Sequence, residues 1–115
     1  AANETGTANT IVNVPLAAGD DGVLFKEAME SVILPRVDGF SPDLILISAG
    51  FDAHARDPLG GLNLVEADFA WATRVLMDLA DKHCDGHLVS VLEGGYDLEG
   101  LARSVAAHVM TLMTG

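Results

Sequence analysis

The chain has 115 residues, half of them apolar, with 17 Asp and Glu against six Lys and Arg and a net charge of −11. That length allows one domain or part of one, and a mean hydropathy of +0.33 is typical of a chain with a buried core. The acidic surface disfavours nucleic acid and anionic membranes as direct partners, because both carry negative charge.

Three further features narrow the class of protein. No apolar run is long enough to cross a membrane, and no basic segment followed by an apolar one opens the chain, so we expect neither a membrane span nor a secretory signal. Cys84 is the only cysteine. A single thiol excludes an internal disulfide and favours a cytoplasmic location.

The amino-terminal part contains one predicted strand and one predicted helix. Residues 1–10 are small and polar and predict a flexible lead to a globular part over residues 11–115. Residues 11–16 form a short β-type run, which Pro15 confines to a sheet edge or a strand end. After an acidic, glycine-containing turn, apolar residues at helical spacing predict a helix over residues 23–34.

The rest of the chain continues the alternation. Leu44–Ile47 is a continuous apolar run, which predicts a strand buried on both faces. A turn-rich loop leads to a helix whose apolar residues recur every three or four positions over residues 65–79. A third strand follows over His87–Leu92, and a last helix begins after Asp97, which we expect to cap it.

This order, β-α-β-α-β-α, predicts an α/β fold with a parallel sheet flanked by helices. Ligands of open parallel sheets bind beyond the carboxyl ends of the strands. Two loops are expected at that edge, Phe51–Gly61 and Glu93–Asp97. A functional site is therefore expected between these two loops.

In the first loop, Asp52 directly follows the predicted buried strand. A carboxylate at a strand end is desolvated unless cations or donors compensate it, so Asp52 is a candidate metal ligand or general base. The alternative is that it caps its own loop. His54 could complete a chelating pair with Asp52, although two ligands do not make a zinc site. Asp57, which precedes a proline, is interpreted as a turn residue.

In the second loop, Tyr96 follows Gly94 and Gly95. Glycines allow close approach of the backbone to a ligand and permit positive φ. The tyrosine hydroxyl could then stabilise a developing oxyanion. The alternative is that its ring packs over the strand end. Glu93 either orients neighbouring donors or is solvated.

Other polar residues have simpler interpretations. His83, Cys84 and His87 offer metal ligands, but they lie at the opposite edge of the sheet and we do not favour a site there. His108 lies beside an apolar helical stripe and is expected at the boundary of the core. No glycine-rich phosphate-binding motif follows a strand.

Four segments carry a resemblance to a known family. They are Asn13–Leu16 with its acidic turn, Ser41–His54, Asp57–Gly60 and Leu92–Asp97. In this order and spacing they closely resemble the histone deacetylase superfamily, in its class II and bacterial branch with acetylpolyamine amidohydrolases and acetoin-utilisation proteins. The resemblance covers essentially Asn13 to the end of the chain.

The resemblance implies part of a three-layer, arginase-like α/β fold and zinc-dependent hydrolysis of acetyl-lysine or an acetylated polyamine. Asp52 would be a carboxylate ligand of the zinc. Tyr96 would donate a hydrogen bond to the tetrahedral oxyanion. Leu59 would line the substrate channel, and Gly94 and Gly95 would shape its wall.

The same resemblance implies that much of the site lies elsewhere. The family's Asp-x-His ligand pair and tandem catalytic histidines precede these motifs, and residues 1–12 do not supply them. His54 matches the motif but is not a zinc ligand of the family. The chain is therefore similar to the carboxyl-terminal third of the domain, is expected to be inactive alone, and is expected to form homo-oligomers that hide uncovered apolar surface.

Two alternatives from other classes remain. A phosphoacceptor receiver module suits the length, the acidity and the strand that starts at Pro42-Asp43, but both lysines, Lys26 and Lys82, lie in predicted helices rather than at a strand end. A non-catalytic interaction module would keep the fold only as a scaffold. The presence of both Asp52 and Tyr96 argues against that interpretation.

Overall fold

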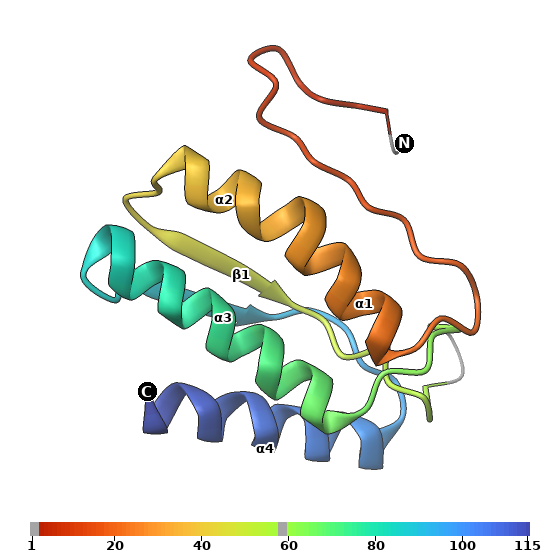
Figure 1. The fold of residues 1–115 in the computed structure, drawn as a ribbon. Coiled ribbons are helices and arrows are strands. Elements are labelled where there is room, and N and C mark those ends of the chain that lie inside the picture. Colours follow the sequence, from red (N-terminus) through yellow and green to blue (C-terminus); the bar gives the residue numbers. More distant parts are fainter. Residues whose placement is uncertain (1–2, 58–59) are drawn as a thin grey trace.

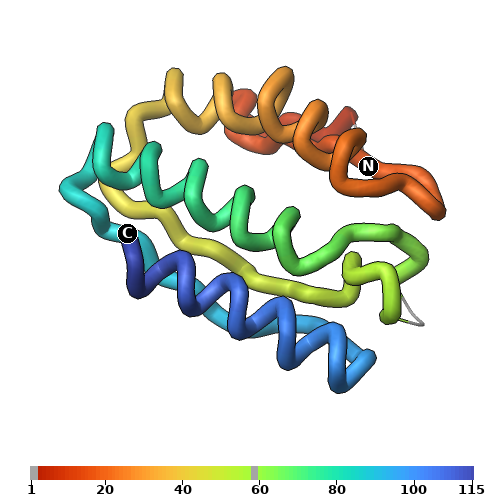
Figure 2. Tube along the Cα trace, turned by 60° about the horizontal axis from the view of Figure 1, so that its bottom comes forward, coloured from red at the N-terminus to blue at the C-terminus, as the bar shows by residue number. Residues whose placement is uncertain are grey.

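The computed structural model describes residues 3–57 and 60–115 as a two-stranded parallel sheet with helices packed along one side (Figure 1). The elements in chain order are α1 (Gly22–Ala28), a π-helical segment (Met29–Ile33), α2 (Leu34–Phe40), β1 (Ile45–Ala49), α3 (Glu66–Cys84), β2 (Leu88–Leu92) and α4 (Leu98–Thr114). In both views α3 lies between the α1–α2 helix and α4 (Figures 1 and 2).

The sheet buries one face. In the β1–β2 register Ile45 is opposite Leu88 and Ala49 is opposite Leu92. Ile45 and Ala49 are buried, and Ile47 between them is partly buried, because all three pack towards the helices. The core side chains they join come from α3 and from the loops around it: Phe51, Leu64, Phe69, Ala80 and Cys84.

The opposite face of the sheet is exposed. Leu46 is 67% exposed, and its β2 partner Val89 and the next outward residue, Val91, are exposed as well. The prediction of a strand buried on both faces is therefore wrong for the described residues. Alternate residues of a strand point to opposite faces, and the helices described here cover only one of them.

The predicted first strand does not form. Residues 11–16 have no regular structure, because Pro15 offers no backbone N–H and no other described segment pairs with this run. Backbone pairing begins only after this run, where Asp21 forms an isolated parallel bridge with Asn63. Beside it, the Gly19 N–H donates to the Gly61 carbonyl at 2.7 Å. The observed order of regular elements therefore begins with a helix.

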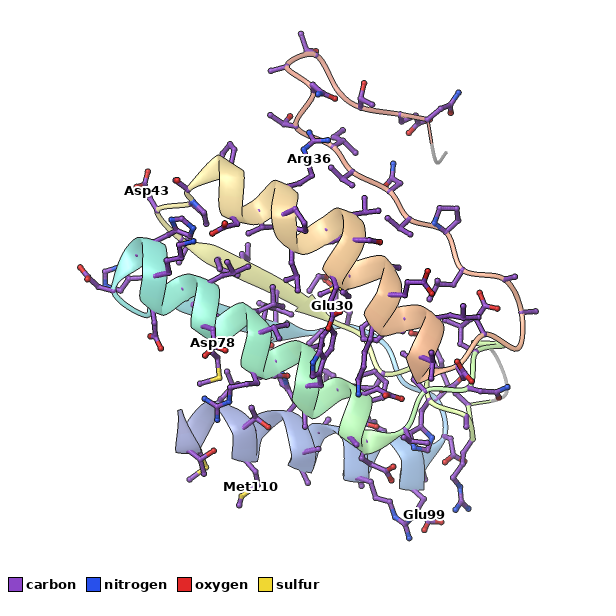
Figure 3. The ribbon with its side chains drawn as sticks, in the orientation of Figure 1. Glu30, Arg36, Asp43, Asp78, Glu99 and Met110 are labelled. Atoms are coloured by element: carbon purple, nitrogen blue, oxygen red, sulfur yellow. The ribbon has the colours of Figure 1, made fainter. Side chains whose placement is uncertain are left out.

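The segment that precedes α1 nevertheless contacts the body of the protein. Arg36 on α2 points towards it (Figure 3), and its Nη2 donates to the Asn9 carbonyl at 2.6 Å. A groove of about 660 Å³ lies between this segment and α2.

The first helix is longer than predicted. Asp21 caps its start by accepting the N–H groups of Val23 and Leu24, but the helix does not end near Pro35. The π-helical turn in front of it places the Leu34 N–H on the Met29 carbonyl, a wider spacing that accommodates a proline inside the helix. Ser41, with φ of 54°, then ends α2.

The two long helices begin in different ways. Val65 is the residue before α3, and its N–H donates to Asp68 Oδ2 at 2.8 Å. Asp97 caps α4 as expected, accepting the Gly100 N–H at 2.7 Å. Among the described residues, no helix is long and apolar enough to cross a membrane.

A buried histidine joins three elements on the covered side of the sheet. His108 of α4 lies 2.7 Å from Thr73 Oγ1 of α3 and 2.8 Å from Ser90 Oγ of β2. Thr73 donates its own proton to the Phe69 carbonyl, so His108 Nδ1 donates to Thr73, and in a neutral imidazole Nε2 then accepts from Ser90. Burial lowers the pKa of His108 below its ordinary value of 6.5, which keeps it neutral.

Candidate functional site

The two predicted loops meet at the carboxyl edge of the sheet. The Glu93 N–H donates to the Ala49 carbonyl at 2.9 Å, and the Phe51 N–H donates to the Gly94 carbonyl at 2.7 Å. These bonds continue the β1–β2 ladder beyond the last paired residues. They bring the residues after each strand side by side, as the rule for parallel sheets predicts.

The Asp52 carboxylate lies between two glycines. A Cβ atom added at Gly50 would be 3.4 Å from Asp52 Oδ1, and one added at Gly94 would be 3.4 Å from Oδ2. Asp52 is partly exposed and makes no hydrogen bond or ion pair with residues 3–57 or 60–115. It does not cap its own loop, so its oxygens are available to a ligand at this edge.

The ring of Tyr96 also approaches Gly94. Its ring atom Cε2 is 3.7 Å from the position a Gly94 Cβ would take, and the residue is 59% exposed. The ring therefore does not pack into the core at the strand end. Gly95 has φ of 144°, and a Cβ there would lie 2.7 Å from Leu101 Cδ1, so only glycine fits between Tyr96 and α4.

Glu93 has a local partner. Its Oε1 accepts a hydrogen bond from Ser48 Oγ at 2.7 Å, across the exposed end of the sheet. This contact joins β1 to the start of the second loop.

His54 faces away from Asp52 and into the protein. It is buried, its ring stacks with Phe69, and its Nδ1 accepts the Arg56 N–H at 3.1 Å. Its Nε2 lies 3.4 Å from Glu66 Oε2 and makes no hydrogen bond within residues 3–57 and 60–115. A Cβ at Gly100 would be 2.8 Å from Nδ1, so glycine at this position of α4 makes room for the imidazole. Asp52 and His54 therefore do not form a chelating pair.

Asp57 is more than the turn residue that the sequence indicated. It is only 7% exposed, and its Oδ2 accepts the N–H groups of Tyr96 at 2.5 Å and Asp97 at 3.2 Å. The signal in the sequence was an aspartate before a proline, which predicts a local turn and gives no information on partners in a distant loop.

The third predicted channel residue, Leu59, lies outside the described residues. Gly60, which follows it, passes so close to Asp52 that a Cβ would overlap the Asp52 carbonyl oxygen. The Asp57–Gly60 motif thus ends against the backbone of Asp52.

The described residues do not form a complete metal site. No group of three or more His, Cys, Asp or Glu side chains in residues 3–57 and 60–115 is placed to hold a metal ion. Asp52 offers one carboxylate, so the described part of the chain does not by itself fit a complete zinc site. At the opposite edge, His83 contacts Asp38 at 2.7 Å and Cys84 Sγ contacts the His87 carbonyl at 3.5 Å, so these groups do not converge on a metal either.

The fold and the two edge loops define an α/β protein with a candidate site at the carboxyl ends of parallel strands. The family model described as "Histone deacetylase domain" matches residues 1–112. The chain therefore belongs to the histone deacetylase family. This assignment does not favour the receiver-module alternative.

Named relatives support the assignment. The chain is 41% identical to Type-2 histone deacetylase 1 of Dictyostelium discoideum over 96% of its own length and 7% of that protein. It is 41% identical to a histone deacetylase-like amidohydrolase of Pseudomonas aeruginosa over 74% of its length and 22% of that protein. The chain thus spans well under half of these relatives.

A solved structure agrees. The crystal structure of the HDA15 HD domain superposes with a TM-score of 0.90 at 37% sequence identity, covering 99% of this chain and 32% of that one. The predicted fold class, part of a deacetylase-type α/β fold with a parallel sheet flanked by helices, is confirmed.

Proposed function

We propose that this chain is the carboxyl-terminal part of a zinc-dependent deacetylase domain that hydrolyses acetyl-lysine or acetylated amines such as polyamines. One observation carries the proposal: the Asp52 carboxylate and the Tyr96 ring both lie against Gly94 at the carboxyl edge of the sheet. Family membership supplies the reaction class, and this placement supplies two groups suited to it.

Asp52 would provide one of the metal ligands in the complete domain. Zinc, when bound, would act as a Lewis acid towards the acetyl carbonyl. The remaining ligands would come from outside the described residues, since these hold no group of three ligating side chains.

Tyr96 would stabilise the transition state. A phenol hydroxyl held near the acetyl carbonyl donates a hydrogen bond to the oxygen as negative charge develops there. Gly94 and Gly95, which leave the edge free of side chains, would shape the channel wall, and Leu59 would line the channel. Acetylated side chains or amines, rather than nucleic acid, suit this acidic chain.

The chain alone is proposed to be inactive, because it holds one of the required metal ligands and lacks the family's general base. The exposed residues Leu46, Val89 and Val91 are proposed to be covered by another copy of the chain when it is studied alone.

A separate proposal concerns the cellular location. The single, buried thiol of Cys84 supports a cytoplasmic location. Imaging of a fluorescent fusion tests the location.

The test of function compares two preparations. For the 115-residue chain, zinc calorimetry and an acetyl-lysine fluorogenic assay should show weak binding and no turnover. In a complete deacetylase domain that carries these residues, Asp52→Asn should lose zinc affinity. Tyr96→Phe, which removes only the hydroxyl, should lower kcat by about 100-fold with little change in KM.

The control is Glu93→Gln, which keeps an acceptor for Ser48 Oγ and should leave kcat within about threefold of wild type, as expected for an exposed hydrogen bond. Full activity of Tyr96→Phe would overturn the assigned role. A zinc-loaded complete domain that hydrolyses none of a panel of acetylated amines would overturn the function.

A further inference from the structure

Asp57 connects the two loops of the candidate site. Its carboxylate is almost completely buried, and one oxygen, Oδ2, accepts two successive backbone N–H groups from Tyr96 and Asp97. These donors lie 39 and 40 positions further along the chain. A buried carboxylate that accepts two amides is a strong, charge-assisted anchor.

We propose that Asp57 is a positioning residue that holds the backbone of Tyr96, and through it the phenol hydroxyl, in the geometry needed at the Asp52 edge. This inference rests on the proposed function of Tyr96. It assigns Asp57 no contact with substrate or metal.

Tyr96 needs such an anchor because its surroundings restrain it little. Two glycines separate it from Glu93, and glycine allows more backbone conformations than any other residue. The Tyr96 side chain is 59% exposed, so packing alone does not fix the ring. One hydrogen bond to Asp57 comes from the Tyr96 N–H and the other from the next residue, so both act on the backbone close to the atoms that set the direction of the Tyr96 side chain.

Asp57 is itself held firmly. Its N–H donates to the His54 carbonyl at 2.9 Å, which closes a turn, and the His54 ring is buried against Phe69 and Gly100. On the second loop, the Asp97 N–H donates the other bond to Asp57, and the Asp97 carboxylate caps α4. The anchor therefore joins the turn after β1 to the first turn of α4, and Tyr96 lies directly at the junction.

The first experiment needs no enzyme activity. Tyr96 is the only tyrosine of the chain, so 3-fluorotyrosine labelling gives a single ¹⁹F resonance from the residue of interest. In Asp57→Ala this resonance should shift or broaden, and hydrogen exchange at the Tyr96 and Asp97 amides should accelerate by about tenfold or more. Asp57→Asn keeps one acceptor oxygen and should show a smaller change.

The matched control is Asp21→Ala. Asp21 also uses one oxygen, Oδ1, to accept two backbone N–H groups, those of Val23 and Leu24, but at the start of α1. The Asp21→Ala variant should show faster hydrogen exchange at the Val23 and Leu24 amides and an unchanged Tyr96 resonance. Unchanged exchange at Tyr96 in both Asp57 variants would overturn the proposal, and Asp57→Asn keeps this test available if Asp57→Ala fails to fold.

The second experiment uses the complete, zinc-loaded domain. Asp57→Ala should lower kcat by about 100-fold with little change in KM, as expected when a catalytic group is misplaced, and Asp57→Asn should restore part of it. In a Tyr96→Phe background, Asp57→Ala should cause little further loss, because both changes act through the same hydroxyl. A fully additive loss would overturn the positioning role.

The two experiments separate the possible failures. A domain without deacetylase activity would refute the proposed function, while the fluorine and exchange measurements would still decide whether Asp57 holds Tyr96. A normal kcat in Asp57→Ala, together with a displaced Tyr96, would refute the proposed dependence of catalysis on the position that Asp57 gives to Tyr96.

Discussion

The two faces of the sheet carry similar side chains in different surroundings. Ile45 points towards the helices and is 8% exposed, whereas its neighbour Leu46 points away and is 67% exposed. Val89 and Val91 extend the exposed face onto β2. The strands are apolar on both faces, so the difference in exposure arises because helices pack against only one of them. The helices described for this chain cover one face of the sheet, and the described residues leave the other face exposed.

The largest expected effect tests this difference directly. Ile45→Ala should lower the free energy of unfolding by about 2–5 kcal/mol, because it leaves a cavity between β1 and α3. Leu46→Ala, one residue away, should change it by less than about 0.5 kcal/mol in a monomeric chain. Urea unfolding followed by the fluorescence of Trp71 measures both. Equal losses would mean that the outer face is covered in solution.

A smaller effect concerns the polar contacts on the covered face. The pKa of His108 is lower in the folded protein than its ordinary 6.5, so the unfolded chain binds this proton more tightly. The contribution of neutral His108 to stability is complete above pH 6.5 and is lost as the pH falls towards the folded pKa.

The measurement is the free energy of unfolding between about pH 7.5 and pH 5, a range that spans the ordinary histidine pKa. The decline with falling pH should be shallower in His108→Gln than in the wild type. His87→Gln replaces an exposed histidine and should retain the wild-type decline. An identical pH dependence in all three proteins would contradict the assignment of neutral His108.

A charged side chain introduced on the exposed face of the sheet should weaken self-association of the chain rather than lower its free energy of unfolding. Leu46→Glu should weaken the proposed self-association of the isolated chain by about tenfold or more, because a carboxylate replaces apolar contact area. Met110→Glu is the control, since this exposed residue of α4 lies away from the sheet (Figure 3). Sedimentation equilibrium gives the dissociation constants. A wild-type chain that is monomeric at micromolar concentration would contradict the proposal.

The smallest effect is expected at a contact that belongs to neither face. Asp38 accepts hydrogen bonds from Lys82 and His83, and these lower its pKa below the ordinary 3.8, Lys82 more than His83. This stabilisation is present above that ordinary value and is lost as the pH falls through the lower folded pKa.

The Asp38 contact lies at the surface, where solvent and salt screen it. Lys82→Ala should therefore leave the urea midpoint at pH 7 nearly unchanged, and raised salt should remove the remaining difference. A large shift of the midpoint would show that this contact is coupled to the core.

Much of this arrangement could be predicted from local sequence patterns. The continuous run at Leu44–Ile47 predicted β1, helical spacing predicted α3 and α4, and the parallel-sheet rule predicted that the loops after β1 and β2 meet. Each of these predictions uses residues close together in the sequence, or a general rule of chain topology.

The errors share a different origin. The run at residues 11–16 has strand chemistry, but a strand also requires a partner, and periodicity does not reveal whether one exists. A proline usually ends a helix, but the π-helical turn before Pro35 accommodates its pyrrolidine ring inside the helix. Asp57 was interpreted from its neighbour in sequence, whereas its partners lie in another loop. Contacts between distant segments decide all three cases.

The parallel pairing of β1 with β2 also has a consequence for the order of events during synthesis. The whole of α3 separates the two strands, so β1 leaves the ribosome long before its partner. Until Leu88–Leu92 has emerged, the edge of β1 that pairs with β2 stays open and its apolar side chains lack their neighbours, which is the kind of nascent segment that aggregates or recruits chaperones. A translational pause after α3 would prolong that exposed state, so synonymous codons in this stretch should affect the yield of folded protein.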